Sequence, residues 1–321
     1  MRYLVTGVAG FIGSAIARKL LDLGKEVVGV DSLTDYYDPR MKQRNLERLA
    51  ARGLDYEVAD LNQVDLAKLL ESIDIILHQA GQPGVRSSWG NEFTVYTQDN
   101  INATQRLLEA AVEARSVRRV VYASSSSVYG DAETFPSQES HLPRPTSPYG
   151  VSKLAAEHLC GLYASNFGIH TVSLRYFTVY GPGQRPDMAF TRFLRAAING
   201  DAVQVYGSGQ QIRDFTFVED VVEANLRAAS GDCSPGSVLN VAGGTSISIN
   251  DTLTLIAEIS GTRLKVVHLG AVRGDVLRTG GSTETIRSTL GWEPRTSIED
   301  GLRSQLQWVV ETYRDSEAKR N

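Results

Sequence analysis

A tyrosine and a lysine stand four residues apart at the start of a predicted helix. Tyr149 follows Pro148 and Lys153 comes one turn later, so both side chains lie on one helix face. A phenol with a pKa of about 10 is a poor base at neutral pH, but a neighbouring ammonium group favours the phenolate. Such a tyrosine could take the proton of an alcohol while a hydride leaves the same carbon for a cofactor. Most Tyr-x-x-x-Lys pairs are solvated helix pairs, so this interpretation needs support from the rest of the chain.

A run of four serines gives part of that support. These serines, 124–127, follow a predicted strand at 118–123. A hydroxyl at Ser125 could hydrogen-bond the same substrate oxygen that Tyr149 deprotonates. A flexible polar loop is the alternative interpretation of the run. Because the serines occur together with Tyr149 and Lys153, we predict three catalytic residues: Tyr149, Lys153 and Ser125.

The first residues of the chain predict where a cofactor binds. A short apolar strand, 2–6, leads into Gly7, Gly10 and Gly13, and an apolar helix begins near Phe11. Glycines at such a turn let backbone N–H groups approach a pyrophosphate, whose charge the helix dipole favours. An ordinary tight turn is the alternative, but the flanking strand and helix supply the context that dinucleotide binding requires. The predicted cofactor contacts in this turn are Gly7, Gly10, Phe11, Ile12 and Gly13.

An acidic residue ends the second predicted strand. The strand 25–31 closes with Asp31, 18 residues after Gly13. A carboxylate at this place accepts hydrogen bonds from ribose hydroxyls and repels a 2′-phosphate. The side chain could instead cap a turn or a helix, but the preceding glycine turn favours the ribose role. The sequence therefore predicts NAD as cofactor, and not NADP.

The composition narrows the class of protein. The 321 residues carry a net charge of −4 without a long basic block, which argues against a nucleic-acid partner. No apolar run is long enough to span a bilayer, and the chain enters a strand too early to leave room for a signal peptide. Cys160 and Cys233 have no metal-type spacing and the histidines are scattered. We therefore expect free thiols in a reducing cytoplasm and no metal site.

Strands alternate with helices through the first half of the chain. This alternation predicts an α/β fold, a Rossmann-type doubly wound parallel sheet whose ligands lie beyond the carboxyl ends of the strands. After Tyr176 the predicted elements become shorter and less regular, which indicates a smaller C-terminal α/β domain for the substrate. We place the cofactor-binding domain at 1–177 with a returning segment at about 213–243, and the substrate domain at 178–212 and 244–321.

Taken together, these motifs resemble those of a known family. The sequence resembles the extended short-chain dehydrogenases/reductases, and among them the nucleotide-sugar epimerases, over nearly its whole length. The closest resemblance is to UDP-glucuronate 4-epimerases, through the segments 31–46 and 84–87. The motifs that carry the resemblance are TGVAGFIG at 6–13, Asp60-Leu61, SSSSVYG at 124–130, SPYGVSK at 147–153, RYFTVYGPGQRPDM at 175–188, RDFTFVED at 213–220 and RGDVLRT at 273–279.

The resemblance implies a mechanism that uses the predicted catalytic residues. Tyr149, assisted by Lys153 and Ser125, removes the proton of the sugar C4 hydroxyl, and hydride passes from C4 to tightly bound NAD. The resulting 4-keto sugar turns over in the site and receives the hydride on its other face, so NAD is regenerated in each turnover. Further cofactor contacts are implied at Asp60 and Leu61, near the adenine, and at Asn100.

The serine run also distinguishes this sequence from relatives with other reactions. Dehydratases of the family carry an Asp-Glu pair after the position of Ser125, and decarboxylases carry a glutamate at the position of Ser127. Neither Ser126 nor Ser127 can act as an acid or base at neutral pH, which argues against both reactions. A 4-keto uronate nevertheless loses CO₂ readily, because it is a β-keto acid. We expect Ser126, Ser127 and Thr178 to hydrogen-bond the C6 carboxylate. These contacts would hold the C–C bond of the carboxylate out of line with the π-system of the keto group.

Arginines in the family motifs complete the predicted substrate site. Guanidinium groups suit a diphosphate because they bind its oxygens in a planar, bidentate manner. The resemblance implies that Arg213 and Arg273 clamp the UDP diphosphate, that Arg185 lies close to the sugar, and that Tyr206 packs near the uracil. The predicted substrate contacts are Arg86, Ser126, Ser127, Thr178, Arg185, Arg192, Tyr206, Arg213 and Arg273.

Three functions stay open on the sequence alone. The first is interconversion of UDP-glucuronate and UDP-galacturonate. The second is 4-epimerisation of UDP-glucose or UDP-N-acetylglucosamine, which would use the same motifs without a carboxylate pocket. The third is a redox-inert NAD-binding regulator, which the presence of Tyr149, Lys153 and Ser125 argues against. The resemblance also implies a homodimer, formed through two long predicted helices at 93–115 and 147–167.

Overall fold

The computed structural model describes residues 1–270 and 276–318. Across these residues, seven strands form one sheet in the order β10-β6-β5-β4-β1-β2-β3. Every neighbouring pair in this sheet is parallel, which confirms the predicted fold class. The strands are β1 (Arg2–Thr6), β2 (Glu26–Asp31), β3 (Asp55–Val58), β4 (Ile75–His78), β5 (Arg119–Ser125), β6 (Thr171–Tyr176) and β10 (Ser237–Val241).

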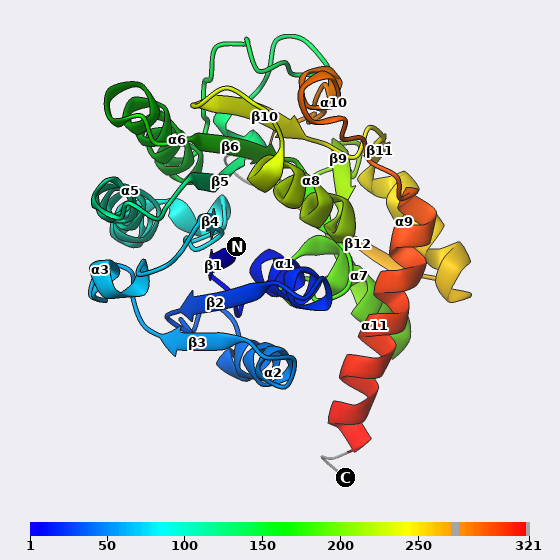
Figure 1. Cartoon of the computed structure of the whole chain (residues 1–321). Coiled ribbons are helices and arrows are strands. Elements are labelled where there is room, and N and C mark those ends of the chain that lie inside the picture. Colours follow the sequence, from blue (N-terminus) through cyan, green and yellow to red (C-terminus); the bar gives the residue numbers. More distant parts are fainter. Residues whose placement is uncertain (271–275, 319–321) are drawn as a thin grey trace.

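Helices cover both faces of this sheet (Figure 1). One face carries α1, α2 and α8, and the other carries α3, α5 and α6. The predicted helix 93–115 has a π-helical middle, Thr97–Asn102, between α4 and α5. The helices around the sheet are α1 (Phe11–Asp22), α2 (Pro39–Ala50), α3 (Leu66–Leu69), α4 (Phe93–Tyr96), α5 (Ala103–Glu113), α6 (Pro148–Phe167) and α8 (Val218–Ser230).

The central strands are buried on both faces, as their continuous apolar sequences predict. In β1, Leu4 packs into the core beneath α5 and α6, whereas Val5 packs into the core beneath α1 and α8. Both side chains have no exposed surface. Since β1 lies between β2 and β4, the direction of chain connection reverses at this strand. Ligands of such sheets bind at this reversal, beyond the carboxyl ends of the strands.

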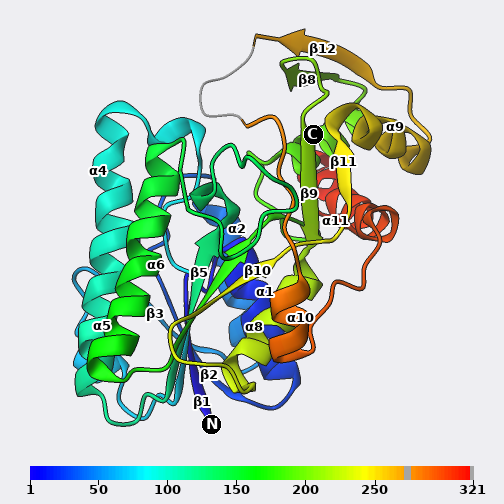
Figure 2. The ribbon, with the colours of Figure 1, turned by 90° about the horizontal axis from the view of Figure 1, so that it is seen from above.

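The smaller part of the molecule lies beyond those carboxyl ends (Figure 2). It contains a three-stranded sheet, β11-β9-β7, and a parallel pair, β12-β8. The chain returns to the large sheet through α8 and β10, so the two-domain division stays a prediction that these pairings support. The elements are β7 (Thr178–Tyr180), α7 (Ala189–Asn199), β8 (Ala202–Tyr206), β9 (Ile212–Phe217), β11 (Ser246–Ser248), α9 (Ile249–Ser260), β12 (Lys265–Leu269), α10 (Glu284–Leu290) and α11 (Ile298–Ala318).

Candidate active site

The glycine turn after β1 is shaped for close approach of a ligand. Gly7 has a φ of +66°, and a Cβ on it would lie 2.8 Å from the backbone nitrogen of Ala80. Helix α1 begins after Gly10 with no side chain capping its first N–H groups. The free N–H groups and the helix dipole suit a pyrophosphate. The turn therefore fits the dinucleotide that the sequence predicts.

Gly13 permits α1 to pack against this turn. A Cβ at Gly13 would lie 2.1 Å from the carbonyl oxygen of Gly7, so Gly13→Ala has to displace the turn. We expect this variant to weaken NAD binding about 10- to 100-fold, measured by calorimetric titration of the NAD-free protein. Gly161→Ala is the control, because its Cβ meets no atom within 4 Å. Unchanged NAD affinity in Gly13→Ala would contradict the predicted role of the turn.

Asp31 ends β2 at the edge of the cavity. Its carboxylate accepts hydrogen bonds from the backbone N–H of Ala9 at 3.1 Å and of Leu33 at 2.9 Å. A carboxylate accepts more than two hydrogen bonds, so capacity remains for ribose hydroxyls. Asp60 and Leu61 line the same cavity, and Leu61 is buried. These positions fit the predicted adenosine contacts, which stay predictions.

Tyr149 lies at the first turn of α6, half-buried beside the serine run. Its ring meets the ring of Tyr96 edge-on, with centroids 6.1 Å apart. Burial raises the pKa of Tyr149, while a hydrogen bond with Ser125 and the positive charge of Arg185 lower it. The Ser125 hydroxyl also accepts a hydrogen bond from the backbone N–H of Ser127 at 3.1 Å. The structure thus brings Tyr149 and Ser125 together, as the sequence predicts.

Lys153 lies one turn further along α6, with its ammonium nitrogen 4.6 Å from the centroid of the Tyr122 ring. Both residues are buried. Burial lowers the pKa of Lys153 to about 8, against the raising effects of Cys160 and Glu157. The face of the Tyr122 ring stabilises the Lys153 ammonium group. In the described part of the chain, no acidic side chain lies within ion-pairing distance of this group. Lys153 also lines the cavity, so its ammonium group is available to a bound cofactor.

The depressed pKa of Lys153 predicts an alkaline limit to activity. A lysine whose pKa lies near 8 loses its ammonium charge as the pH rises through about 8, and Tyr149 then loses the cation that favours its phenolate. We expect kcat/KM to fall above this pH, measured from pH 6 to 10 with a UDP-sugar. Lys153→Arg keeps its charge over this range, so its residual activity should not show the same alkaline fall. A wild-type profile that stays flat to pH 10 would contradict the assignment.

Asn100 lies in the π-helical segment and ties two parts of the site together. Its side-chain oxygen accepts the backbone N–H of Gln82 at 2.7 Å, and its amide donates to the Ser152 hydroxyl at 2.9 Å. Single π-helical turns occur frequently at functional sites. Asn100 thereby fixes the loop after β4 against α6. Its predicted direct contact with the cofactor stays a prediction.

One cavity joins the glycine turn to four of the nine predicted substrate residues. It is lined by Ser126, Ser127, Thr178 and Arg185 together with Tyr149, Lys153 and Ser125. Thr178 begins β7, and Ser126 and Ser127 form a short 3-10 turn after β5. Hydroxyl groups and one guanidinium therefore line the same cavity as Tyr149. This is a surface suited to a polar, negatively charged sugar.

Among the described residues, the other predicted substrate residues do not line that cavity. The Arg86 guanidinium stacks 4.2 Å from the centroid of the Tyr206 ring, which joins the loop after β4 to β8. Arg192 on α7 donates to Gln204 at 3.4 Å, and Arg213 on β9 donates to the carbonyl of Ile212 at 2.9 Å. Their roles stay predictions. Arg273 lies outside the described residues.

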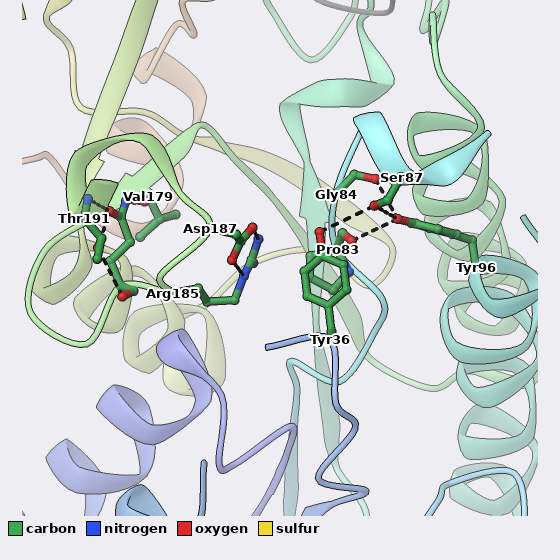
Figure 3. Close-up of polar contacts among 10 residues, drawn as sticks. Tyr36, Pro83, Gly84, Ser87, Tyr96, Val179, Arg185, Asp187 and Thr191 are labelled. Carbon is green, nitrogen blue, oxygen red and sulfur yellow. Dashed lines mark hydrogen bonds and ion pairs between the residues drawn. The ribbon is translucent and has the colours of Figure 1, made fainter. Parts of the chain in front are cut away.

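Several residues near Tyr149 could not be recognised from the sequence. Figure 3 shows Tyr36 between the loop 83–87 and the Arg185–Asp187 pair. The Tyr96 hydroxyl binds Ser87 at 2.7 Å and the carbonyl of Gly84 at 2.8 Å, which shapes that loop. No local motif marks these side chains, because they belong to loops whose meeting depends on the whole fold.

Two features are absent from the described part of the chain, a metal-binding cluster and a membrane-spanning helix. No group of three or more His, Cys, Asp or Glu side chains in 1–270 and 276–318 is placed to hold a metal ion. Over the same residues, no helix is both long and apolar enough to cross a membrane. Cys160 and Cys233 are buried free thiols.

Comparison with known proteins agrees with the geometry of the site. A family model described as the NAD dependent epimerase/dehydratase family matches residues 3–242. An uncharacterized UDP-glucose epimerase of Bacillus subtilis is 40% identical over 315 residues, which are 98% of this chain and 99% of that protein. A UDP-glucuronate 4-epimerase of Thermodesulfobacterium geofontis is 36% identical over 314 residues, with 96% of each chain covered.

A solved structure gives the same result in three dimensions. The UDP-glucuronic acid 4-epimerase of Bacillus cereus, crystallised with UDP-glucuronic acid and NAD, is 38% identical to this chain. The two structures match with a TM-score of 0.93 over 98% of this chain and 100% of that one. With the glycine turn, the Tyr-Lys pair and the family match in agreement, this chain belongs to the NAD dependent epimerase/dehydratase family.

Proposed function

We propose that this protein is an NAD-dependent 4-epimerase that interconverts UDP-glucuronate and UDP-galacturonate. The observation that carries the proposal is the shared cavity, which places Tyr149, Lys153 and Ser125 between the glycine turn and a polar end lined by Ser126, Ser127, Thr178 and Arg185. The Bacillus cereus relative with 38% identity was crystallised with UDP-glucuronic acid and NAD. Hydroxyl and guanidinium groups at the sugar end suit a substrate that carries a carboxylate.

The residues around the glycine turn fit NAD. The turn would hold the pyrophosphate, Asp31 the adenosine ribose, and Asp60 with Leu61 the adenine edge. The Lys153 ammonium faces the same cavity and would bind the nicotinamide ribose. When bound, NAD supplies a hydride acceptor that later returns the hydride to the sugar. The Asp31 carboxylate disfavours the additional phosphate of NADP by like-charge repulsion.

The side chains around C4 of the sugar move its proton. Tyr149 as phenolate takes the proton from the C4 hydroxyl, and Ser125 holds the same oxygen through a hydrogen bond. Lys153 favours the phenolate by its charge, and Arg185 acts on Tyr149 in the same direction. After the 4-keto sugar has turned over, Tyr149 gives the proton back to the oxygen. The reaction begins and ends with the same cofactor state, so it needs no external redox partner.

The hydroxyl groups at the polar end are expected to protect the intermediate. A 4-keto uronate loses CO₂ when its carboxylate bond aligns with the keto π-system, and we expect Thr178 and Ser127 to prevent that alignment. Thr178→Val should therefore increase the 4-keto-pentose by-product several-fold, measured by NMR of the product mixture. Thr178→Ser keeps the hydroxyl and should release no more by-product than the wild type. Unchanged product purity in Thr178→Val would contradict this role.

A neutral sugar is the second candidate substrate. The Bacillus subtilis relative named as a UDP-glucose epimerase is 40% identical to this chain, more than the UDP-glucuronate 4-epimerase of Thermodesulfobacterium geofontis at 36%. Incubation of the purified protein with UDP-glucuronate, UDP-glucose and UDP-N-acetylglucosamine, followed by NMR, separates the candidates. UDP-galacturonate formed from the uronate supports the proposal. If only the neutral sugars are converted, the substrate is a neutral UDP-sugar and not UDP-glucuronate. If no sugar is converted even with added NAD, the result favours an inert NAD-binding protein.

The outer faces of α4 and α6 support a homodimer. Val95 on α4 and Val151, Leu162 and Phe167 on α6 are apolar side chains with 39–58% of their surface exposed. Helices of this kind bury apolar surface when two copies pair. Sedimentation of the purified protein at micromolar concentration should give twice the mass of 35.1 kDa.

The buried free thiols support a reducing cytoplasm as the location of the protein.

A further inference from the structure

Arg185 is held by a neighbour in its own loop. Its Nε donates to Oδ1 of Asp187 at 3.0 Å, and its Nη2 donates to Oδ2 at 2.9 Å (Figure 3). This is a bidentate pair that uses one edge of the planar guanidinium. The side chain of Arg185 is 18% exposed and that of Asp187 is 40% exposed. The pair is therefore sheltered on the side of the arginine and open to water on the side of the aspartate.

Arg185 has hydrogen-bond donors that Asp187 does not use. Asp187 occupies only two of the five N–H donors of the guanidinium, and no other described residue accepts a hydrogen bond from Arg185. Arg185 lines the cavity together with Tyr149, and its charge lowers the pKa of that tyrosine. The centroid of the Tyr36 ring lies 5.5 Å from the guanidinium carbon of Arg185. Three N–H donors and the positive charge of Arg185 thus have no further acceptor among the described residues, in a side chain that lines the same cavity as Tyr149.

Asp187 contacts Arg185 from outside this cavity. It is absent from the described lining, which contains Arg185 and Met188 on either side of it in the sequence. A carboxylate at C6 of a hexose is attached one carbon away from C4, so a cation close to Tyr149 is also close to that carboxylate. The Asp187 carboxylate would then bind one edge of the Arg185 guanidinium, and the carboxylate of the substrate would bind the opposite edge.

We propose that Asp187 is a positioning residue that weakens the hold of Arg185 on the carboxylate of the substrate, so that the 4-keto uronate can turn over in the site. The inference rests on the proposed function. Epimerisation requires the sugar to leave one orientation and take another, and each contact made in the first orientation has to break. A guanidinium without a carboxylate partner would bind the uronate more tightly and release it more slowly. Asp187 neutralises part of the positive charge of Arg185 and so weakens the binding of the uronate carboxylate.

Asp187→Asn removes the charge and keeps an oxygen that can accept a hydrogen bond from Arg185. Removal of a negative charge a few ångströms beyond the guanidinium should tighten binding of UDP-glucuronate by about tenfold. Binding of UDP and of UDP-glucose, which lack the sugar carboxylate, should stay unchanged. Calorimetric titration of the NAD-loaded protein measures all three. In the same variant kcat for UDP-glucuronate should fall several-fold, because turnover of the intermediate becomes slower.

A matched control removes a negative charge elsewhere. Glu299→Gln disrupts a surface ion pair with Arg303 on α11 and changes the net charge by the same amount. This variant should bind UDP-glucuronate like the wild type. If Asp187→Asn is poorly folded, Asp187→Ser replaces it in the same measurements. A purely structural role of Asp187 would change the affinities for UDP, UDP-glucose and UDP-glucuronate alike.

The outcomes separate this inference from the proposed function. If the wild-type protein does not epimerise UDP-glucuronate, the proposed function is wrong and the inference falls with it. If the wild type does epimerise the uronate, equal affinities of the wild type and Asp187→Asn for UDP-glucuronate overturn the inference alone. An increase in affinity without a decrease in kcat would also overturn it, because the sugar would then turn over freely while tightly held.

Discussion

Tyr149→Phe lowers kcat for UDP-sugar epimerisation by about 10³-fold and leaves the binding of NAD nearly unchanged. The change removes one hydroxyl and keeps the ring that packs edge-on against Tyr96. General acid–base groups contribute about 10²- to 10⁴-fold to catalysis, and the proposed mechanism uses Tyr149 as base in one half-reaction and as acid in the other. Steady-state kinetics with UDP-glucuronate and titration with NAD measure the two quantities.

A second tyrosine on the same helix provides the control. The Tyr163 hydroxyl hydrogen-bonds Glu109 and Gln105, far along α6 from the cavity. Tyr163→Phe should retain the wild-type kcat within about threefold, because it removes a hydroxyl of the same kind outside the site. If Tyr149→Phe kept more than a tenth of the wild-type kcat, another group would have to move the proton. Ser125 is the hydroxyl predicted to bind the same substrate oxygen, so Ser125→Ala would be the next variant.

The parts of the site that follow local rules could be predicted from the sequence. Gly7 stands between β1 and α1, and Gly13 lies in the first turn of α1. The close approaches of their backbone explain why larger residues do not fit. Tyr149 and Lys153 share a helix face because helical geometry fixes a separation of four residues. Strand alternation predicts the parallel sheet, and the sheet brings the serine run and the glycine turn to one cavity. Each of these inferences needs only the pattern within an element or the order of elements along the chain.

The missing parts depend on packing between distant elements. Tyr122 lies in an apolar strand, and nothing in that strand shows that its ring supports the Lys153 ammonium. Asp187 belongs to a turn-rich segment in which an acidic residue is ordinary, so its pairing with Arg185 appears only in the structure. The short strands β7, β9, β11 and β12 have three to six residues. Segments of that length carry too few positions for a clear alternation.

A buried ion pair beneath the serine run predicts the largest effect on stability. Arg175 on β6 donates to both carboxylate oxygens of Glu157 on α6, at 2.6 and 3.0 Å, and only 4% and 3% of the two side chains are exposed. Ser124 donates to the same carboxylate at 2.6 Å. Arg175 also donates to the Tyr129 hydroxyl at 2.8 Å. All of these groups are buried, so the loss of one charge leaves the other without compensation.

Glu157→Gln should lower the free energy of unfolding by about 3–5 kcal/mol, which is the cost of leaving a buried arginine unpaired. Urea unfolding of the NAD-free protein measures this change without the stabilisation that bound cofactor adds. The double variant Glu157→Met/Arg175→Met removes both charges, and we expect it to be more stable than Glu157→Gln although it loses more hydrogen bonds. The physical reason is that an apolar pair leaves no uncompensated charge, whereas Glu157→Gln leaves a buried guanidinium without its counter-charge. If the double variant were the less stable of the two, the hydrogen bonds to Ser124 and Tyr129 would outweigh the charge pairing. The hydrogen-bond network rather than the ion pair would then hold β5, β6 and α6 together beneath the predicted catalytic residues.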